Sequence, residues 1–244
     1  MLSVRSPHAR TRSDPRDDPP AARRLRHDLV GSQSVHLELH AEALSEGRHD
    51  RADQPVAAAR DRLLLVVHRD LAGDHPMHRL LQGEVGSGKT VVAVRAMLTV
   101  VDSGGQAALL APTEVLAAQH YRAITTLLGP LAERGRLGAH DEGTGVTLLT
   151  GSMTTAARRQ ALLDITSGQA GIVIGTHALL EDRVDFFDLG LVVIDEQHRF
   201  GVEQRDALKT KAKLPPHLLV MTATPIPRTV AMTVFGDLDV STLR

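Results

Sequence analysis

From Asp70 onward, short aliphatic runs alternate with longer stretches in which apolar residues recur at helical spacing. The runs lie at 107–112, 146–151, 171–176, 191–196 and 218–224, and a shorter one occupies 79–82. The predicted helices are Thr90–Asp102, Glu114–Leu128, Thr154–Thr166 and Val202–Lys211. Strand–helix alternation with fully apolar strands is typical of a parallel sheet covered by helices. We therefore predict an α/β fold in which the polar residues that follow each strand share one sheet edge.

Residues 1–69 have a different character. They are rich in Arg, Asp, His and Pro, contain no Lys, and have one sustained apolar run, at 63–67. Such a segment cannot bury enough apolar surface to fold, so we predict a disordered leader over 1–69 and a folded domain over 70–244. Interleaved acidic residues disfavour both an organelle transit peptide and a basic arm that binds nucleic acid.

Composition narrows the classes of function. The apolar fraction of 42% supports a core, but the aromatic fraction of 2% makes that core aliphatic and argues against binding by base stacking. The formal charge of -1 gives no global field for a polyanion, and the absence of Cys excludes disulfides and thiolate chemistry. No apolar run reaches membrane-spanning length and no secretory signal is present, so a soluble cytoplasmic protein without a membrane partner is expected.

The octapeptide GEVGSGKT, at 83–90, matches the phosphate-binding pattern G-x-x-x-x-G-K-[ST]. Gly83, Gly86 and Gly88 can adopt backbone angles closed to other residues, so that successive N–H groups turn toward a phosphate. The helix predicted to begin beside them points its positive end at the same anion. A chance Gly-rich turn is the alternative, but the apolar run before the loop and the helical pattern after it argue against it.

Three other residues of this loop are predicted to bind the nucleotide. Ser87 lies between the last two glycines, Lys89 supplies a mobile charge for the outer phosphates, and Thr90 offers a hydroxyl suited to Mg²⁺. The candidate cofactors are therefore ATP and Mg²⁺.

The run at 191–194 ends abruptly in Asp195, Glu196, Gln197 and His198. Asp195 is placed to hold Mg²⁺ through water, and Glu196 to orient or deprotonate an attacking water. A kinase needs no second acid for water, so the pair of acids favours hydrolysis. Gln197 and His198 exceed what hydrolysis requires, and an isolated Gln–His pair would be interpreted as a strand cap.

These blocks resemble superfamily 2 helicases, and more closely RecG-type ATP-dependent DNA helicases. The resemblance covers about 70–244 and rests on separated motifs. They are HPMHRLLQGEVGSGKT (75–90), APTEVLAAQH (111–120), LLTGS (148–152), IVIGTHALL (172–180), DEQHRFGVEQR (195–205) and TATPIPRT (222–229). The resemblance implies a RecA-like ATP-binding lobe, hydrolysis of ATP, and action on branched or forked DNA in recombination and repair, with a monomer expected.

The resemblance also implies roles for residues that follow the strands. The candidate DNA contacts are Thr113, Glu114, Gly151, Ser152, Thr176 and His177. The candidates for coupling ATP state to DNA movement are Gln197, His198, Thr222 and Thr224. Small hydroxyl residues and backbone N–H groups suit phosphate contacts that ignore base sequence. A basic stretch at 205–213 is a further candidate, although such stretches are more often solvated helix faces.

The motor of transcription-repair coupling translocases is the nearest competing family, because it shares GTH, HRFGV and TATPIPRT. It usually has DEEH where Gln197 stands, a bulky residue at Ser87 and Thr at Glu114. These three positions favour the RecG type.

The resemblance accounts for the first motor lobe alone. The family continues into a second lobe, whose arginines accelerate phosphoryl transfer by ~10³–10⁵, so this chain is expected to bind nucleotide more readily than it hydrolyses it. The family's upstream adenine-reading Gln motif and wedge domain are not recognisable in 53–74. Residues 1–69 are therefore hypothesised to be an out-of-frame translation or to follow a misplaced start.

Two functional classes remain open at this point: a DNA helicase motor lobe, and a catalytically inactive fragment that binds ATP and DNA. A small P-loop kinase is disfavoured by DEQH at 195–198 and by TATPIPRT.

Overall fold

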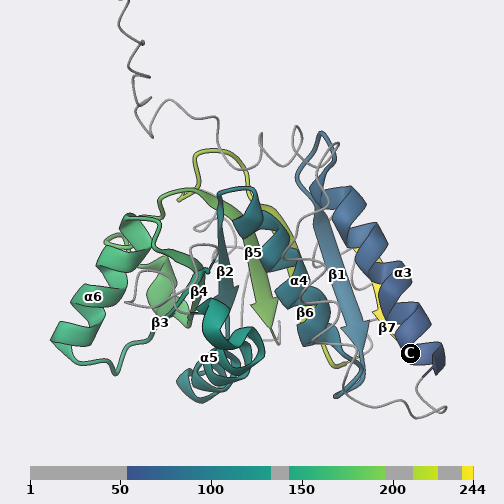
Figure 1. Cartoon of the computed structure of the whole chain (residues 1–244), viewed down its shortest axis with the longest axis horizontal. Coiled ribbons are helices and arrows are strands. Elements are labelled where there is room, and N and C mark those ends of the chain that lie inside the picture. Colours follow the sequence, from purple (N-terminus) through teal and green to yellow (C-terminus); the bar gives the residue numbers. More distant parts are fainter. Residues whose placement is uncertain (1–53, 133–142, 196–210, 225–237, 244) are drawn as a thin grey trace, which may run out of the picture.

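The computed structural model describes residues 54–132, 143–195, 211–224 and 238–243. Their centre is a seven-stranded parallel sheet in the order β3-β4-β2-β5-β6-β1-β7 (Figure 1). The strands are β1 (His78–Gly83), β2 (Gln106–Leu110), β3 (Gly145–Leu149), β4 (Ala170–Gly175), β5 (Leu189–Asp195), β6 (His217–Thr222) and β7 (Asp239–Leu243). The predicted α/β fold with a parallel sheet is confirmed.

Helices cover both faces of this sheet. They are α3 (Gln54–Leu71), α4 (Lys89–Asp102), α5 (Glu114–Leu128), α6 (Thr155–Thr166) and two short 3-10 helices, η2 (Gly129–Ala132) and η3 (His177–Leu180). Successive residues of a strand point to opposite faces of the sheet, and each face has its own hydrophobic core. Leu109 belongs to the core that contains residues of α3, α4 and α5, and Leu110 to the core that contains residues of α6 and η3. Both cores are almost entirely aliphatic, as the composition predicts. The helix predicted at 202–211 lies almost wholly outside the described residues.

The helix α3 shows that the folded part begins earlier than predicted. The boundary was expected at residue 70, but α3 starts at Gln54, and its side chains Leu63, Val67 and Leu71 are buried in the core. These residues recur every four positions, so they form one stripe that faces α4. The apolar run at 63–67 carries part of this stripe, but the Arg, Asp, His and Pro content of 1–69 led to a prediction of disorder for the whole segment. Residues 1–53 of the predicted leader lie outside the described residues.

Arg79 joins three elements on the same side of the sheet. From β1, this buried arginine donates to Asp70 of α3 (Nε–Oδ2, 2.9 Å) and to Ser241 of β7 (Nη1–Oγ, 2.6 Å). The hydrogen bond between Arg79 and Asp70 joins two charged groups and is therefore of the stronger kind. A second carboxylate, that of Asp239, lies 3.5 Å from Arg79 Nη2. This network fixes α3 and β7 against the strand that leads into the phosphate-binding loop.

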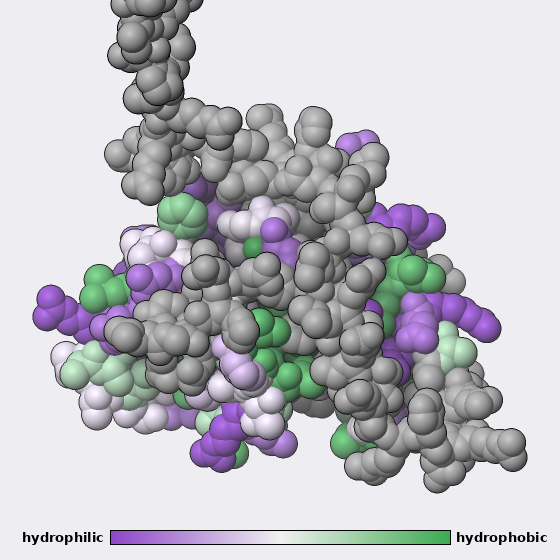
Figure 2. Space-filling model, viewed as in Figure 1, coloured by the Kyte–Doolittle hydropathy of each residue, from purple (hydrophilic) through white to green (hydrophobic). Residues whose placement is uncertain are grey.

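The surface of the described part is mixed. On both flanks, over α6 and α3, hydrophilic and apolar side chains lie side by side (Figure 2). Large exposed apolar residues are scattered, for example Leu65 on α3 and Leu163 on α6, which is ordinary for a folded domain. Among the described helices, none combines the length and the apolar character needed to cross a bilayer.

Candidate nucleotide and DNA site

The loop between β1 and α4 has the backbone geometry of a phosphate cradle. Gly86 and Gly88 have backbone φ angles of 85° and 92°, which residues other than glycine rarely adopt. Gly88 is also the N-cap of α4, where no side chain caps the helix. The first N–H groups of α4 are therefore directed toward this loop, with the positive end of the helix dipole.

Close packing explains the first glycine of the loop. A Cβ atom on Gly83 would lie 2.6 Å from Ser87 Oγ and 3.0 Å from the carbonyl oxygen of Leu243. Within the described residues, Ser87 Oγ is buried and has no hydrogen-bond partner. A buried hydroxyl with unused hydrogen-bonding capacity fits a loop that receives an anion, because leaving such a group unmatched costs free energy.

Lys89 and Thr90 open α4 beside this loop. The ammonium of Lys89 donates to the carbonyl oxygens of Gly83 (2.6 Å) and Glu84 (2.7 Å), which holds the charge over the loop rather than in bulk solvent. Thr90 is partly exposed next to it. Two oxygen ligands, one from Thr90 and one from Asp195, fit Mg²⁺, which keeps several waters and takes phosphate oxygens as further ligands.

Strand register brings Asp195 to the same edge as the phosphate-binding loop. Asp195 on β5 pairs with Met221 on β6, and Met221 pairs with Leu81 on β1, two residues before Gly83. All three strands are parallel, so their carboxyl ends meet at one rim. Neighbouring strands are about 4.8 Å apart, which separates the backbones of Asp195 and Leu81 by about 10 Å. That distance suits two groups on either side of a metal–triphosphate complex.

A further helix residue, His120, contacts this carboxylate. Its Nε2 lies 2.6 Å from Asp195 Oδ2, and the two side chains are only 13% and 15% exposed. Sequence reasoning quoted His120 as part of a motif but assigned it no role. The available signal was its spacing on α5, three residues after the buried Ala117 and four before the buried Ile124.

Three of the candidate DNA contacts lie together. Glu114 begins α5 and accepts hydrogen bonds from the backbone N–H of Ser152 (3.0 Å) and from its hydroxyl. A Cβ on Gly151 would lie 3.1 Å from a Glu114 oxygen. The hydrogen bond from the Ser152 side chain lowers the pKa of Glu114, with smaller contributions from backbone N–H groups and the charge of His177. These residues follow β2, β3 and β4, and form one group at the carboxyl edge of the sheet.

Both threonines among these candidates act as helix caps. Thr113 caps α5 by accepting from the N–H of Leu116 (3.2 Å), and Thr176 caps η3 by accepting from Ala178. Thr176 is 2% exposed, so its hydroxyl supports the local backbone. A contact between Thr176 and DNA stays a prediction.

The coupling candidates are described in part. Thr222 is fully buried at the end of β6, and its hydroxyl lies 3.0 Å from that of Thr224 and accepts from the Thr224 N–H. The two threonines thus form one hydrogen-bonded turn. Glu196, Gln197 and His198 lie outside the described residues, and their predicted roles stay predictions.

The described lysines of the basic stretch have other contacts. Lys211 donates to the carbonyl oxygens of Glu181 and Val184, and Lys213 lies 5.0 Å from the centre of the Phe187 ring. Phe187 precedes β5, so Lys213 lies toward the amino edge of the sheet, opposite the phosphate-binding loop. Lys213 therefore does not extend the candidate DNA surface.

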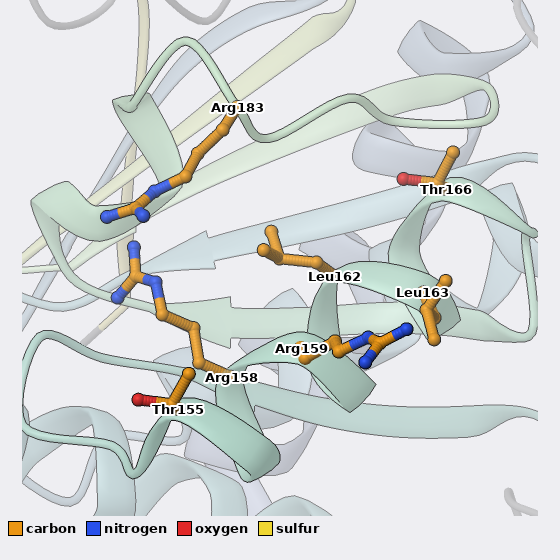
Figure 3. Close-up of a pocket in the computed structure, with 7 residues that line it drawn as sticks. All are labelled: Thr155, Arg158, Arg159, Leu162, Leu163, Thr166 and Arg183. Atoms are coloured by element: carbon orange, nitrogen blue, oxygen red, sulfur yellow. The ribbon is translucent and has the colours of Figure 1, made fainter.

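A separate hollow of about 310 Å³ lies on α6, far from the loop after β1. It is lined by Thr155, Arg158, Arg159, Leu162, Leu163, Thr166 and Arg183 (Figure 3). Arg158 and Arg183 converge there because both bind Glu181, at 2.8 Å and 2.6 Å. The strand beside α6 is β3, five positions from β1 in the sheet, so the hollow is not part of the nucleotide site.

Comparison with known proteins defines the class. The family model for DEAD/DEAH box helicases matches residues 65–233. The chain therefore belongs to the DEAD/DEAH box helicase family, consistent with a phosphate-binding loop and an acidic strand end on one parallel sheet.

Similar curated proteins specify the type. The ATP-dependent DNA helicase RecG of Mycobacterium tuberculosis strain H37Rv is 64% identical over 191 residues, covering 78% of this chain and 26% of that protein. RecG of Aquifex aeolicus is 49% identical over 184 residues, covering 75% of this chain and 22% of that protein. The RecG-type resemblance predicted from the motifs is confirmed, and the chain spans about a quarter of these relatives' length.

Solved structures agree with the sequence comparisons. A structure of RecG bound to a three-way DNA junction matches with a TM-score of 0.64 and 37% identity, covering 84% of this chain and 25% of that one. Yeast Dbp5, at 16% identity and a TM-score of 0.58, covers 87% of this chain and 52% of its own. The second match supports the fold alone.

Proposed function

We propose that this chain is the ATP-binding motor lobe of a RecG-type DNA helicase that remodels branched DNA during recombination and repair in the cytoplasm. The observation that carries the proposal is the common rim formed by the loop 83–90 and Asp195. A lobe that binds a nucleoside triphosphate needs both groups within reach of one ligand.

Different residues of this site are proposed to bind the phosphates of ATP, the metal and the attacking water. Backbone N–H groups of the glycine loop and the ammonium of Lys89 hold the phosphates, while Thr90 and Asp195 would hold Mg²⁺. When bound, the metal neutralises charge on the phosphate oxygens. Glu196, next in the sequence, orients the water that attacks the outer phosphate. The hydroxyl turn at Thr222 and Thr224 senses the change at the neighbouring strand end.

DNA is proposed to bind across the ends of β2, β3 and β4. Donors in these loops, including the Ser152 N–H and hydroxyl, suit phosphate oxygens and read no base sequence. The RecG structure named above holds a three-way DNA junction, which supports branched DNA as the partner of this chain.

Titration with a fluorescent ATP analogue tests the nucleotide site. Lys89→Ala is expected to weaken binding at least tenfold, because the charge over the phosphates is lost. Lys213→Ala removes the same charge from the opposite edge of the sheet and is expected to leave the affinity unchanged. Equal affinities in Lys89→Ala and the unaltered chain would refute the proposal.

Phosphate-release assays with and without forked DNA separate the two open classes. DNA-stimulated turnover that disappears in Glu196→Gln identifies a working motor. Nucleotide binding without turnover identifies a lobe that holds ATP and depends on other parts of a helicase for hydrolysis.

A further inference from the structure

The contact between His120 and Asp195 joins a helix to the strand end that carries the proposed metal ligand. The distance of 2.6 Å is short for a nitrogen–oxygen hydrogen bond, and both side chains are largely buried. An ionised carboxylate can only accept, so Nε2 of His120 must carry the hydrogen and donate it. The bond therefore fixes one of the two oxygens of Asp195.

His120 lies on the face of α5 that is turned toward the sheet. Ala117, Ile124 and Leu128 form the buried stripe of α5, and His120 lies within that stripe by spacing. An imidazole among apolar side chains costs free energy unless its N–H groups find partners. Asp195 supplies one such partner at the carboxyl end of β5, beside the phosphate-binding loop.

The carboxylate keeps the capacity to bind a metal. Two oxygens offer about four acceptor positions, and His120 occupies one of them on Oδ2. A buried carboxylate with one oxygen anchored cannot rotate freely between side-chain conformers. The remaining positions are then presented in a fixed direction, which reduces the entropy lost when a metal complex binds.

We propose that His120 is a positioning residue that orients the Asp195 carboxylate toward the magnesium–nucleotide complex. The inference rests on the proposed function, because it assumes that Asp195 holds the metal. Partners that hold metal-binding carboxylates in place usually change metal affinity by 10–100-fold when removed. The alternative is a histidine that only fills the space between α5 and the sheet.

The positioning role and the space-filling role of His120 predict different effects of MgCl₂ on nucleotide affinity. A space-filling histidine affects folding stability and changes nucleotide binding equally with and without the metal. A positioning histidine leaves metal-free binding intact, since the phosphates still meet the glycine loop and Lys89. It changes only the extra affinity that MgCl₂ confers.

The experiment titrates a fluorescent ATP analogue into the full chain, first in EDTA and then over a range of MgCl₂ concentrations. His120→Ala is expected to bind as tightly as the unaltered chain in EDTA. It should require about tenfold more MgCl₂ to reach its half-maximal gain in affinity. His120→Gln, which retains a side-chain N–H donor, should recover part of that loss. His75→Ala, on an exposed loop residue, serves as the matched histidine control and should behave as the unaltered chain.

Four results would overturn the inference. An unchanged MgCl₂ requirement in His120→Ala, even with a lower melting temperature, assigns the residue to packing alone. Equal weakening in EDTA and in MgCl₂ leads to the same conclusion, and a control melt of His120→Gln shows whether the fold survives. If the unaltered chain binds the analogue without any gain from MgCl₂, the inference fails together with the proposed metal site. If it does not bind the analogue at all, the proposed function fails as well.

Discussion

The carboxylate of Glu114 accepts hydrogen bonds from the backbone N–H and the hydroxyl of Ser152. A DNA phosphate at this position would use the same two donors. Two residues predicted to contact DNA are therefore paired with each other. The Glu114 oxygens hold the loop after β3 against the first turn of α5. A phosphate that approaches Ser152 meets an acidic group, so DNA binding at this point requires Glu114 to move away or to share the donors of Ser152 with the phosphate.

The pKa of Glu114 gives a direct test of this pairing. The Ser152 hydroxyl bond is the largest cause that lowers this pKa below the ordinary value of 4.5, because it favours the ionised form. The contact therefore stabilises the fold at pH values above the ordinary pKa, and that contribution is lost as pH falls through the lowered one. NMR titration of the carboxyl carbon should give a midpoint below 4.5 in the unaltered chain, and Ser152→Ala should raise it. Identical midpoints in the two proteins would contradict the pairing.

At the scale of elements, α3 is the main surprise. It belongs to a segment predicted to be disordered, yet three of its side chains enter the main core. Asp70, near its end, also binds the buried Arg79 of β1. The helix passes close to the nucleotide site as well, since a Cβ on Gly88 would lie 3.6 Å from Arg60 Cδ.

Two leucines on α3, one buried and one exposed, allow the packing of this helix to be tested with a matched control. Leu71 is fully buried and Leu65 is 72% exposed. Leu71→Ala should lower the free energy of unfolding by about 2–5 kcal/mol, the usual cost of a buried leucine. Leu65→Ala should change it by less than about 0.5 kcal/mol. Urea denaturation followed by circular dichroism measures both changes, and equal effects would mean that α3 does not pack as described.

At the scale of the whole molecule, strand order decides where function lies. The β2, β4 and β3 strands place the candidate DNA loops on one half of the rim, and β1 with β5 places the nucleotide residues on the other. The net charge of -1 provides no long-range attraction for DNA. If this chain binds DNA as proposed, its affinity is expected to arise from a few local contacts and to be weak.

Salt dependence measures how many phosphates are neutralised by cationic side chains. The candidate contacts in the three loops are uncharged hydroxyl and backbone N–H groups, so the logarithm of the association constant should fall with log[salt] at a slope shallower than about -1. Fluorescence anisotropy with labelled forked DNA between about 50 and 200 mM salt measures that slope. Ser152→Ala should reduce the affinity, and Lys213→Ala at the opposite sheet edge should not. A slope of roughly -3 or steeper, or a strong dependence on base sequence, would contradict contacts made by the uncharged donors of this rim.

The sequence alone determined six of the described strands, the helices after β1, β2 and β3, and the glycine loop, because these features depend on local patterns. Fully apolar runs mark strands buried on both faces, and positive φ angles at Gly86 and Gly88 follow from glycine itself. The strand β7 and the packing of α3 were missed. The strand β7 is partly exposed, and the apolar run of α3 at 63–67 stands in a segment otherwise rich in Arg, Asp, His and Pro. The candidate residues Glu196, Gln197 and His198 lie outside the described part.

Only the tertiary structure decided which side chains meet, including His120, to which the sequence assigned no role. Glu114 and Ser152 are 38 positions apart in the chain, and His120 and Asp195 are 75 apart. Neither pair has a local signature, because each depends on the order in which parallel strands and their crossover helices assemble. The sequence thus identified the groups that could bind a nucleotide and DNA, and the sheet order determined which of them lie within hydrogen-bonding distance.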